Sequence, residues 1–139
     1  MKLTPLLYLI LLIVASFCFS CGDDDNAIQE DCISEVINNY GLHLEGDGDP
    51  VTEETTLPDQ LTDANWGLKA IVCEQGGYDL NAYTGQRISL TKYRIIEICD
   101  GEPLYLWILT NEDECICAYK TVREDSSAAP GVFAVEGCD

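Results

Sequence analysis

Six cysteines spread along residues 32–138 constrain the fold of this chain more than any other feature. Their number is even, and they follow an apolar N-terminal leader of the kind that exported proteins carry. Because export compartments are oxidising, we expect three disulfides, for which fifteen pairings are possible. A thiolate metal site is the alternative, although the C-x-x-C spacing typical of such sites does not occur. The six cysteines are Cys32, Cys73, Cys99, Cys115, Cys117 and Cys138.

Residues 1–20 read as a signal peptide. Lys2 supplies a short basic start, and an apolar run of 14 residues follows at positions 6–19. A helix needs about 20 apolar residues to span a bilayer, so this run is too short for a transmembrane segment. Its length fits the hydrophobic region of a cleaved signal instead.

Ser20 and Cys21, followed by an acidic stretch, resemble the processing site of a bacterial lipoprotein. The resemblance implies that Cys21 receives palmitate or similar acyl chains and becomes the first residue of the mature protein. It also implies that residues 21–26 form an acidic tether and that the protein is attached to the cell envelope, at the outer membrane or the cell surface. Cys18 and Phe19 depart from the usual pattern, which has leucine in place of Cys18. The alternative is an ordinary secretory signal that leaves Cys21 as a thiol.

The charge of the chain excludes some partners. Its formal net charge is −18, with 25 acidic residues against seven lysines and arginines. Such a chain repels nucleic acid and anionic lipid, and no basic stripe offsets the repulsion. We therefore expect no nucleic-acid partner. The apolar content is high enough for a folded core, and residues 27–139 have the length of one domain.

Two helices are predicted in the first half of the chain. Apolar residues recur at helical spacing over residues 27–40, and Gly41 is a suitable stop. Thr62 or Asp63 can cap a second helix that runs to about Gln75, with Leu68, Ile71 and Val72 directed inward. Residues 51–57 are expected to form a short edge strand.

The second half of the chain predicts consecutive strands joined by short turns. The expected strands are residues 87–99, 104–110, 115–122 and 132–136. Connections this short produce an antiparallel meander. We therefore expect an α+β domain, with two helices packed on a four- to five-stranded antiparallel sheet and stabilised by disulfides.

The strand at residues 104–110 is apolar on both faces, because Tyr105, Trp107 and Leu109 alternate with leucines and an isoleucine. A sheet with two apolar faces needs two covers. One helix on each face satisfies this requirement, and we favour that arrangement. Alternatively both helices cover one face, and Tyr105 and Trp107 belong to a binding surface on the other. Symmetric pairing about the turns adds Ile96, Ile98, Ile116 and Ala118 to the face of Tyr105.

The strand patterns predict one bulge and one disulfide. Apolar positions change parity between Ile88 and Tyr93, which predicts a bulge near Thr91 or Lys92. Cys115 and Cys117 should point to one face of their strand and reach different partners. Pairing of the last two strands brings one of these two cysteines near Cys138, and we expect that disulfide.

Part of the chain resembles a family of small bacterial lipoprotein domains without an assigned activity. The resemblance rests on the segment GYDLNAYTG at residues 77–85, followed by Tyr93-Arg94-Ile95 and by Gly101-Glu102-Pro103. In the family, the pattern G-[YF]-D-L-x-x-Y-x-G joins a helix to a sheet. The resemblance covers most of residues 28–136 and implies a fold and a compartment, but no activity.

No pattern of catalytic residues stands out. The chain has one histidine, His43, and lacks the G-x-S-x-G, S-x-x-K and H-E-x-x-H motifs. We therefore assign no catalytic residue and expect no cofactor. Asp47, Asp49 and Glu53 are weak candidates for calcium, because hard oxygen ligands lie close together on a glycine-rich loop. Their spacing differs from that of an EF-hand.

These observations predict a non-enzymatic module of the cell envelope that binds a protein, a peptide or a glycan. An envelope hydrolase that uses paired carboxylates is one alternative. A structural module that binds calcium weakly is another.

Overall fold

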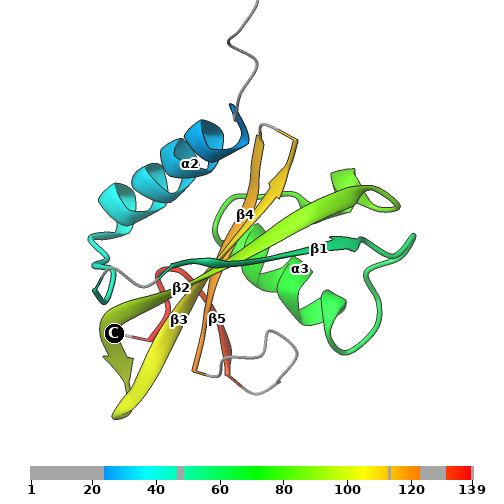
Figure 1. Ribbon diagram of the computed structural model, residues 1–139. Coiled ribbons are helices and arrows are strands. Elements are labelled where there is room, and N and C mark those ends of the chain that lie inside the picture. Colours follow the sequence, from blue (N-terminus) through cyan, green and yellow to red (C-terminus); the bar gives the residue numbers. More distant parts are fainter. Residues whose placement is uncertain (1–23, 47–48, 113, 123–130, 139) are drawn as a thin grey trace, which may run out of the picture.

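Figure 1 shows the computed structural model of the chain, a five-stranded antiparallel sheet packed between two α-helices. The structure describes residues 24–46, 49–112, 114–122 and 131–138. The strands lie side by side in the order in which they occur along the chain, so the sheet is a meander. The α+β class and the antiparallel sheet predicted from the sequence are confirmed.

Strand lengths differ between the centre and the edges of the sheet. The pairing of the second and third strands is the longest, and a tight turn at Asp100 and Gly101 joins them. Both turn residues have positive φ, 51° and 85°, as the two central positions of a type I′ hairpin turn require. The strands are β1 (Val51–Thr56), β2 (Arg87–Cys99), β3 (Glu102–Asn111), β4 (Glu114–Thr121) and β5 (Val132–Ala134).

The helices are α2 (Asp24–Tyr40) and α3 (Trp66–Gln75), with a short 3₁₀ helix, η1 (Leu80–Tyr83), after α3. The helix α2 begins three residues before the predicted start, so it includes part of the expected tether. The helix α3 begins after Asp63, whose Oδ1 accepts hydrogen bonds from the backbone N–H groups of Asn65 and Trp66, both at 2.8 Å. These bonds satisfy donors that the helix itself leaves unpaired.

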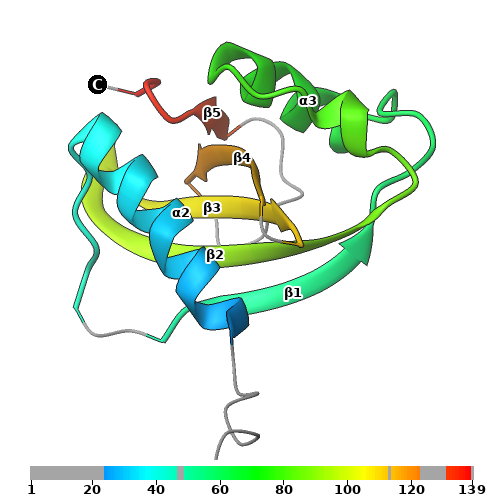
Figure 2. The same ribbon diagram turned by 90° about the horizontal axis from the view of Figure 1, so that it is seen from above.

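One helix covers each face of the sheet, which confirms the arrangement favoured above (Figure 2). On the α3 side, Val72 and Cys73 pack against alternate residues of the central strands. On the α2 side, Cys32, Ile33 and Val36 pack against the other set. The buried core on the α3 side includes Leu57, Leu80, Ile88, Leu90, Tyr105, Trp107, Leu109, Ile116, Cys117 and Tyr119, and that on the α2 side includes Leu42, Ile95, Cys99, Leu104, Leu106, Ile108 and Ala118.

The predicted bulge near Thr91 or Lys92 is wrong. Pairing of β2 with β3 is continuous from Ser89 to Arg94, and the irregularity lies between Arg94 and Ile98. The apolar pattern changes parity because the two ends of β2 are buried on different faces. Ile88 and Leu90 belong to the core on the α3 side, and Ile95 and Cys99 to the core on the α2 side.

A bulge on β4 controls the directions of two cysteines. Leu109 pairs with Cys117, but the next residue of β3, Thr110, pairs with Cys115, so Ile116 is an extra residue on β4. The prediction that Cys115 and Cys117 share one face is therefore wrong. Cys115 lies with the core on the α2 side, and Cys117 with the core on the α3 side.

All six cysteines form disulfides, which confirms the predicted number. Cys32 on α2 is bonded to Cys115, and Cys73 on α3 is bonded to Cys117. The Cα atoms of these pairs lie 5.7 and 5.4 Å apart, respectively. The third disulfide joins Cys99 to Cys138, with 5.7 Å between the Cα atoms. The prediction that Cys115 or Cys117 is bonded to Cys138 is therefore wrong, because each of the two β4 cysteines is bonded to a helix.

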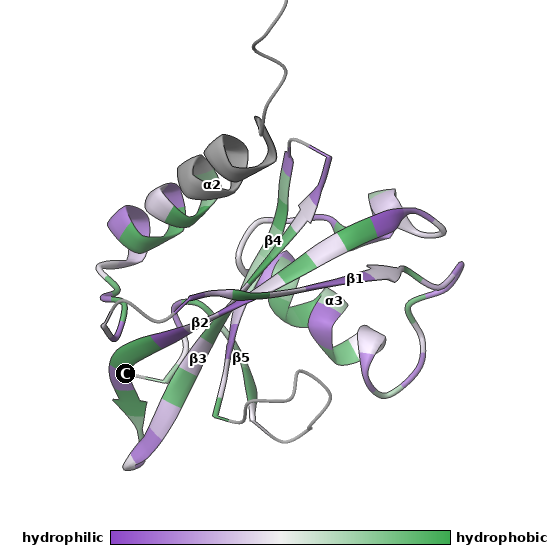
Figure 3. Cartoon of the chain, in the orientation of Figure 1, coloured by the Kyte–Doolittle hydropathy of each residue, from purple (hydrophilic) through white to green (hydrophobic). Residues whose placement is uncertain are grey.

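Hydropathy differs along the strands, as Figure 3 shows. The edge strand β1 is largely polar, whereas the far end of β2 is apolar and exposed. Ile96 and Ile98 there are 57% and 65% exposed. The expectation that both residues join the apolar face of Tyr105 is therefore wrong. Ala118 packs on the α2 side instead of the face of Tyr105. Ile71 of α3, expected to be directed inward, is exposed.

Candidate functional site

The residue Gly41 ends α2 and shapes a hollow at that end of the helix. Its φ of +62° is one that side-chain-bearing residues rarely adopt, and it turns the chain back toward the sheet. Leu42 is then buried, and its N–H donates to the carbonyl of Ile37 at 3.1 Å. The chain next follows the free edge of β2, where Ile96 N–H donates to the carbonyl of His43 at 2.9 Å.

A cavity of about 540 Å³ lies beside this turn, and we call it the α2-end cavity. It is formed where the C-terminal end of α2 meets the C-terminal end of β2 and the segment after β5. Figure 1 shows these segments together near the end marked C. A volume of this size lies in the range of ligand-binding pockets, about 300–1,000 Å³. The lining residues are Asn39, Tyr40, Gly41, Leu42, Glu97, Ile98, Lys120, Val135, Glu136 and Cys138.

Glu97 is held in this cavity wall by His43. The Oε1 atom of Glu97 accepts a hydrogen bond from the backbone N–H of His43 at 2.9 Å and lies 3.0 Å from its Nδ1 atom. The Oε2 atom is shielded from solvent and has no hydrogen-bond partner. The side chain as a whole remains 27% exposed, so part of it reaches the surface of the cavity although Oε2 does not.

Two other charged residues line the α2-end cavity. Lys120 of β4 is only 4% exposed and is engaged in an interaction within the chain. Glu136, after β5, is exposed. The cavity therefore combines two carboxylates with one buried ammonium group.

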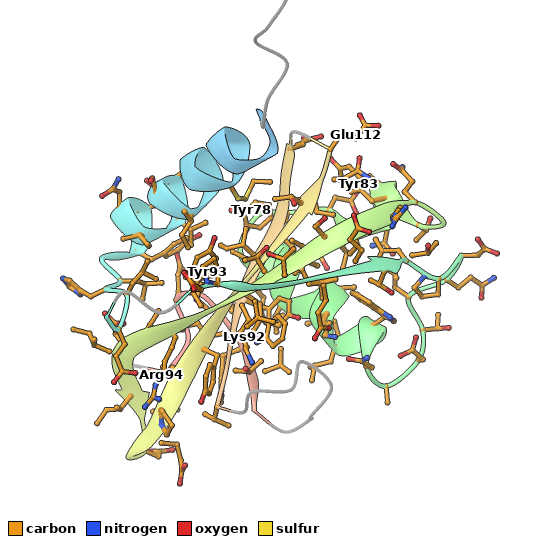
Figure 4. All side chains as sticks on the ribbon, in the orientation of Figure 1. Tyr78, Tyr83, Lys92, Tyr93, Arg94 and Glu112 are labelled. Carbon is orange, nitrogen blue, oxygen red and sulfur yellow. A yellow bond between two sulfur atoms is a disulfide. The ribbon has the colours of Figure 1, made fainter. Side chains whose placement is uncertain are left out.

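A smaller cavity of about 220 Å³ lies beside β2, where residues 44–46, Asp49 and Val51 form the other part of its lining. Arg94 forms an ion pair with Glu45 at its edge. Lys92 lies over the rings of Tyr105 and Trp107, with its Nζ atom 5.6 and 5.8 Å from their centroids. Figure 4 shows that Lys92 and Tyr93 are directed to opposite sides of β2, as the alternation of a strand requires.

Lys69 is a buried cation on the inner side of α3. It is 1% exposed, and its Nζ atom lies 4.4 Å from the ring centroid of Trp66 and 6.0 Å from that of Tyr119. Burial lowers the pKa of Lys69 from 10.5 to about 8, and the charges of Asp63 and Glu53 oppose that shift. A cation over aromatic faces is stabilised by their quadrupoles, which offsets part of the cost of removing it from water.

Tyrosines of the linker segment have raised pKa values. Burial is the main reason that the pKa of Tyr78 is raised, followed by the charges of Tyr40 and Glu35. A hydrogen bond to Glu114 is the main cause of the raised pKa of Tyr83. Figure 4 places Tyr83 and Glu112 at the same end of the molecule, near the turn between β3 and β4. The two tyrosines therefore stay neutral and serve as packing and hydrogen-bonding groups.

The structure corrects the aromatic surface considered above. Tyr105 is 8% exposed and Trp107 is 3% exposed, because the α3 side of the sheet is covered. The indole N–H of Trp107 donates to Oγ1 of Thr121 at 3.0 Å inside this core. Neither ring is available as a binding surface.

The calcium candidates are not brought together by the described residues. Asp47 lies outside the described residues, Asp49 lines the small cavity beside β2, and Glu53 is an exposed residue of β1. Within residues 24–46, 49–112, 114–122 and 131–138, no group of three or more His, Cys, Asp or Glu side chains is placed to hold a metal ion. Cys21 also lies outside the described residues. In the same ranges, neither α-helix has the length and apolar character required to cross a membrane.

Comparison with known proteins gives no match, whether with protein-family models, with curated proteins or with solved structures.

The sequence pattern missed Glu97, His43 and Lys120 as a group. A signal for Glu97 existed in hindsight, because a carboxylate stands between two isoleucines at a position of β2 that faces α2. Its contact with His43, 54 residues away, depends on how the loop after α2 follows the edge of β2. Nothing in the local pattern predicts that path.

Proposed function

We propose that this chain is a lipid-anchored protein of the bacterial cell envelope, and that its domain is a non-enzymatic interaction module. The domain is displayed by acyl chains on Cys21 and binds a protein, peptide or glycan partner. Three disulfides support an oxidising compartment, because such bonds persist outside the reducing cytosol.

The distribution of charge on the domain is the observation that carries the binding role. Among the described residues, Arg87 and Arg94 are paired with Glu54 and Glu45, Lys92 lies over aromatic rings, and Lys69 and Lys120 are buried. Within residues 32–46, 49–112, 114–122 and 131–138, every aspartate and glutamate except Glu97 is exposed. The two exposed arginines are therefore paired with glutamates and the described surface carries a large excess of negative charge, which favours positively charged partners and accelerates their association.

The anchor is tested by labelling with radioactive palmitate in a bacterial host that processes lipoproteins. We expect the full-length protein and its Cys18→Ser variant to incorporate label and to sediment with membranes, because Cys21 carries the lipid. The Cys21→Ser variant should lose both properties. Equal labelling of the Cys21→Ser variant would contradict the anchor.

The binding role is tested with the membrane-anchored protein and chemical cross-linking in intact cells. We expect a defined cross-linked partner whose yield falls as salt is raised, because exposed charges are screened over about 10 Å at 0.1 M. A yield that does not change between low and high salt would argue against an electrostatic interaction module.

A further inference from the structure

We propose that the α2-end cavity receives a basic side chain, a lysine or an arginine, of a partner protein. This inference rests on the proposed function, because it names the chemistry of the partner and the place where it binds. The occupant follows from the carboxylates of the cavity, its apolar rim and its position on the domain.

The carboxylate of Glu97 has one oxygen without a hydrogen-bond donor. Both polar contacts of its carboxylate with His43 use Oε1, and Oε2 is buried without a hydrogen-bond partner. A buried acceptor without a donor costs about 1–3 kcal/mol, and more when it is charged. A lysine ammonium or an arginine guanidinium would supply the missing donor and a compensating charge. The carboxylate can turn toward the cavity, because the terminal torsion of a glutamate is soft.

The rest of the cavity fits the same occupant. Glu136 adds a second carboxylate, and Ile98, which is 65% exposed, offers an apolar surface for the aliphatic stem of a lysine or arginine. Lys120 is engaged within the chain, and its ammonium group is the one positive charge that a basic occupant would meet among the lining residues. The net charge of −18 attracts a basic partner over a longer range.

The position of the cavity suits a partner that approaches an anchored protein. Two residues separate Cys21 from the start of α2 at Asp24. At 1.5 Å per residue, the 17 residues of α2 span about 25 Å. The α2-end cavity lies at the opposite end of this helix, so the length of α2 separates it from the proposed attachment site.

The cavity is tested by nuclear magnetic resonance on the isotope-labelled, lipidated protein in neutral detergent micelles. The probe is N-acetyl-L-lysine-N-methylamide, and the matched control is the norleucine compound, which lacks the ammonium group. We expect saturable amide shifts confined to the cavity residues with the lysine probe and none with the norleucine probe. Glu97→Gln should weaken binding roughly tenfold, as expected when one charge-assisted hydrogen bond becomes neutral.

Two further variants keep the test decisive. Glu136→Gln, at the exposed rim, should weaken binding several-fold without disturbing the core, and Glu74→Gln, on α3, should leave it unchanged. Shifts spread over the whole acidic surface, or equal affinity in Glu97→Gln and Glu74→Gln, would overturn the cavity proposal. If cross-linking in cells then still captures a partner with Glu97→Gln, the cavity proposal fails while the interaction module stands. If the probe binds the cavity but no partner is captured, the module fails instead.

Discussion

Cys115 and Cys117 are two residues apart on β4, yet they form disulfides with helices on opposite faces of the sheet. The extra residue, Ile116, makes this possible because it reverses the alternation between them. Strand β4 is therefore covalently linked to both helices.

Removal of either helix disulfide should destabilise the domain without abolishing its fold. We expect Cys32→Ala with Cys115→Ala, and separately Cys73→Ala with Cys117→Ala, to lower the free energy of unfolding by about 2–4 kcal/mol each. Replacing both partners leaves no unpaired thiol. Denaturant titration measures the loss, and mass spectrometry of unreduced peptides checks the linkages. A peptide that links Cys115 or Cys117 to Cys138 would refute the pairing.

The hydrogen bond between Trp107 and Thr121 should contribute to stability, because it satisfies a buried indole N–H. Thr121→Val leaves that donor without this acceptor and should lower the free energy of unfolding by about 1–3 kcal/mol. Thr121→Ser retains the hydroxyl and is the matched control. Thermal unfolding with tryptophan fluorescence as the readout compares the two. Equal stability of both variants would show that the bond contributes nothing.

Lys69 predicts a specific dependence of stability on pH. Its pKa is about 8 in the folded protein and 10.5 in the unfolded chain, so the unfolded chain binds more protons between these values. Stability should therefore rise as pH increases from 8 to 10.5, by about 3 kcal/mol in total at 1.4 kcal/mol per unit. Lys69→Met should lack this rise while sharing every other titration. Parallel curves of unfolding free energy against pH for the two proteins would contradict the burial of a charged lysine.

The linker between α3 and β2 should be part of the core. Leu80 is 1% exposed and Ile71 is 55% exposed. Leu80→Ala should cost about 2–5 kcal/mol, because it leaves a cavity in the core on the α3 side. Ile71→Ala removes a similar volume from the surface and should change stability by less than about 0.5 kcal/mol. Urea unfolding of both variants makes the comparison, and similar midpoints would argue against this packing.

Local pattern predicted much of the architecture. Alternating apolar residues and tight turns gave β2 its bounds and placed the other strands within a few residues, because side-chain periodicity and turn chemistry act over short distances. Helical spacing located both helices. An apolar run on both faces of β3 indicated a helix on each side, as the structure confirms.

The errors arose where distant parts of the chain decide the outcome. The two ends of β2 are buried on opposite faces of the sheet, so its apolar residues shift from even to odd positions, as they would across a bulge. On β4, nothing in the sequence Cys115-Ile116-Cys117 indicates the bulge. The two cysteines were therefore expected on one face, and the disulfide partner of Cys138 was predicted wrongly. The alternative binding surface at Tyr105 and Trp107 was the interpretation that failed, because α3 covers that face, in line with the favoured arrangement.

The site was the least predictable part of the molecule. In the sequence, His43 stands out only as the one histidine of the chain; in the structure it is exposed and contacts one oxygen of Glu97. The α2-end cavity combines residues from both ends of the chain with residues of β2 and β4. Such a combination depends on tertiary packing and has no counterpart in a single stretch of sequence.

The bond between Cys32 and Cys115 would have a mechanical consequence if the domain is held by its N-terminus, as proposed above. A force that enters ahead of α2 can extend the residues before Cys32, but it then passes through the disulfide into the start of β4. The rest of α2 is not peeled away, because the pull bypasses it. A tethered domain under load from flow or from a captured partner would thus keep its sheet and the far end of that helix intact.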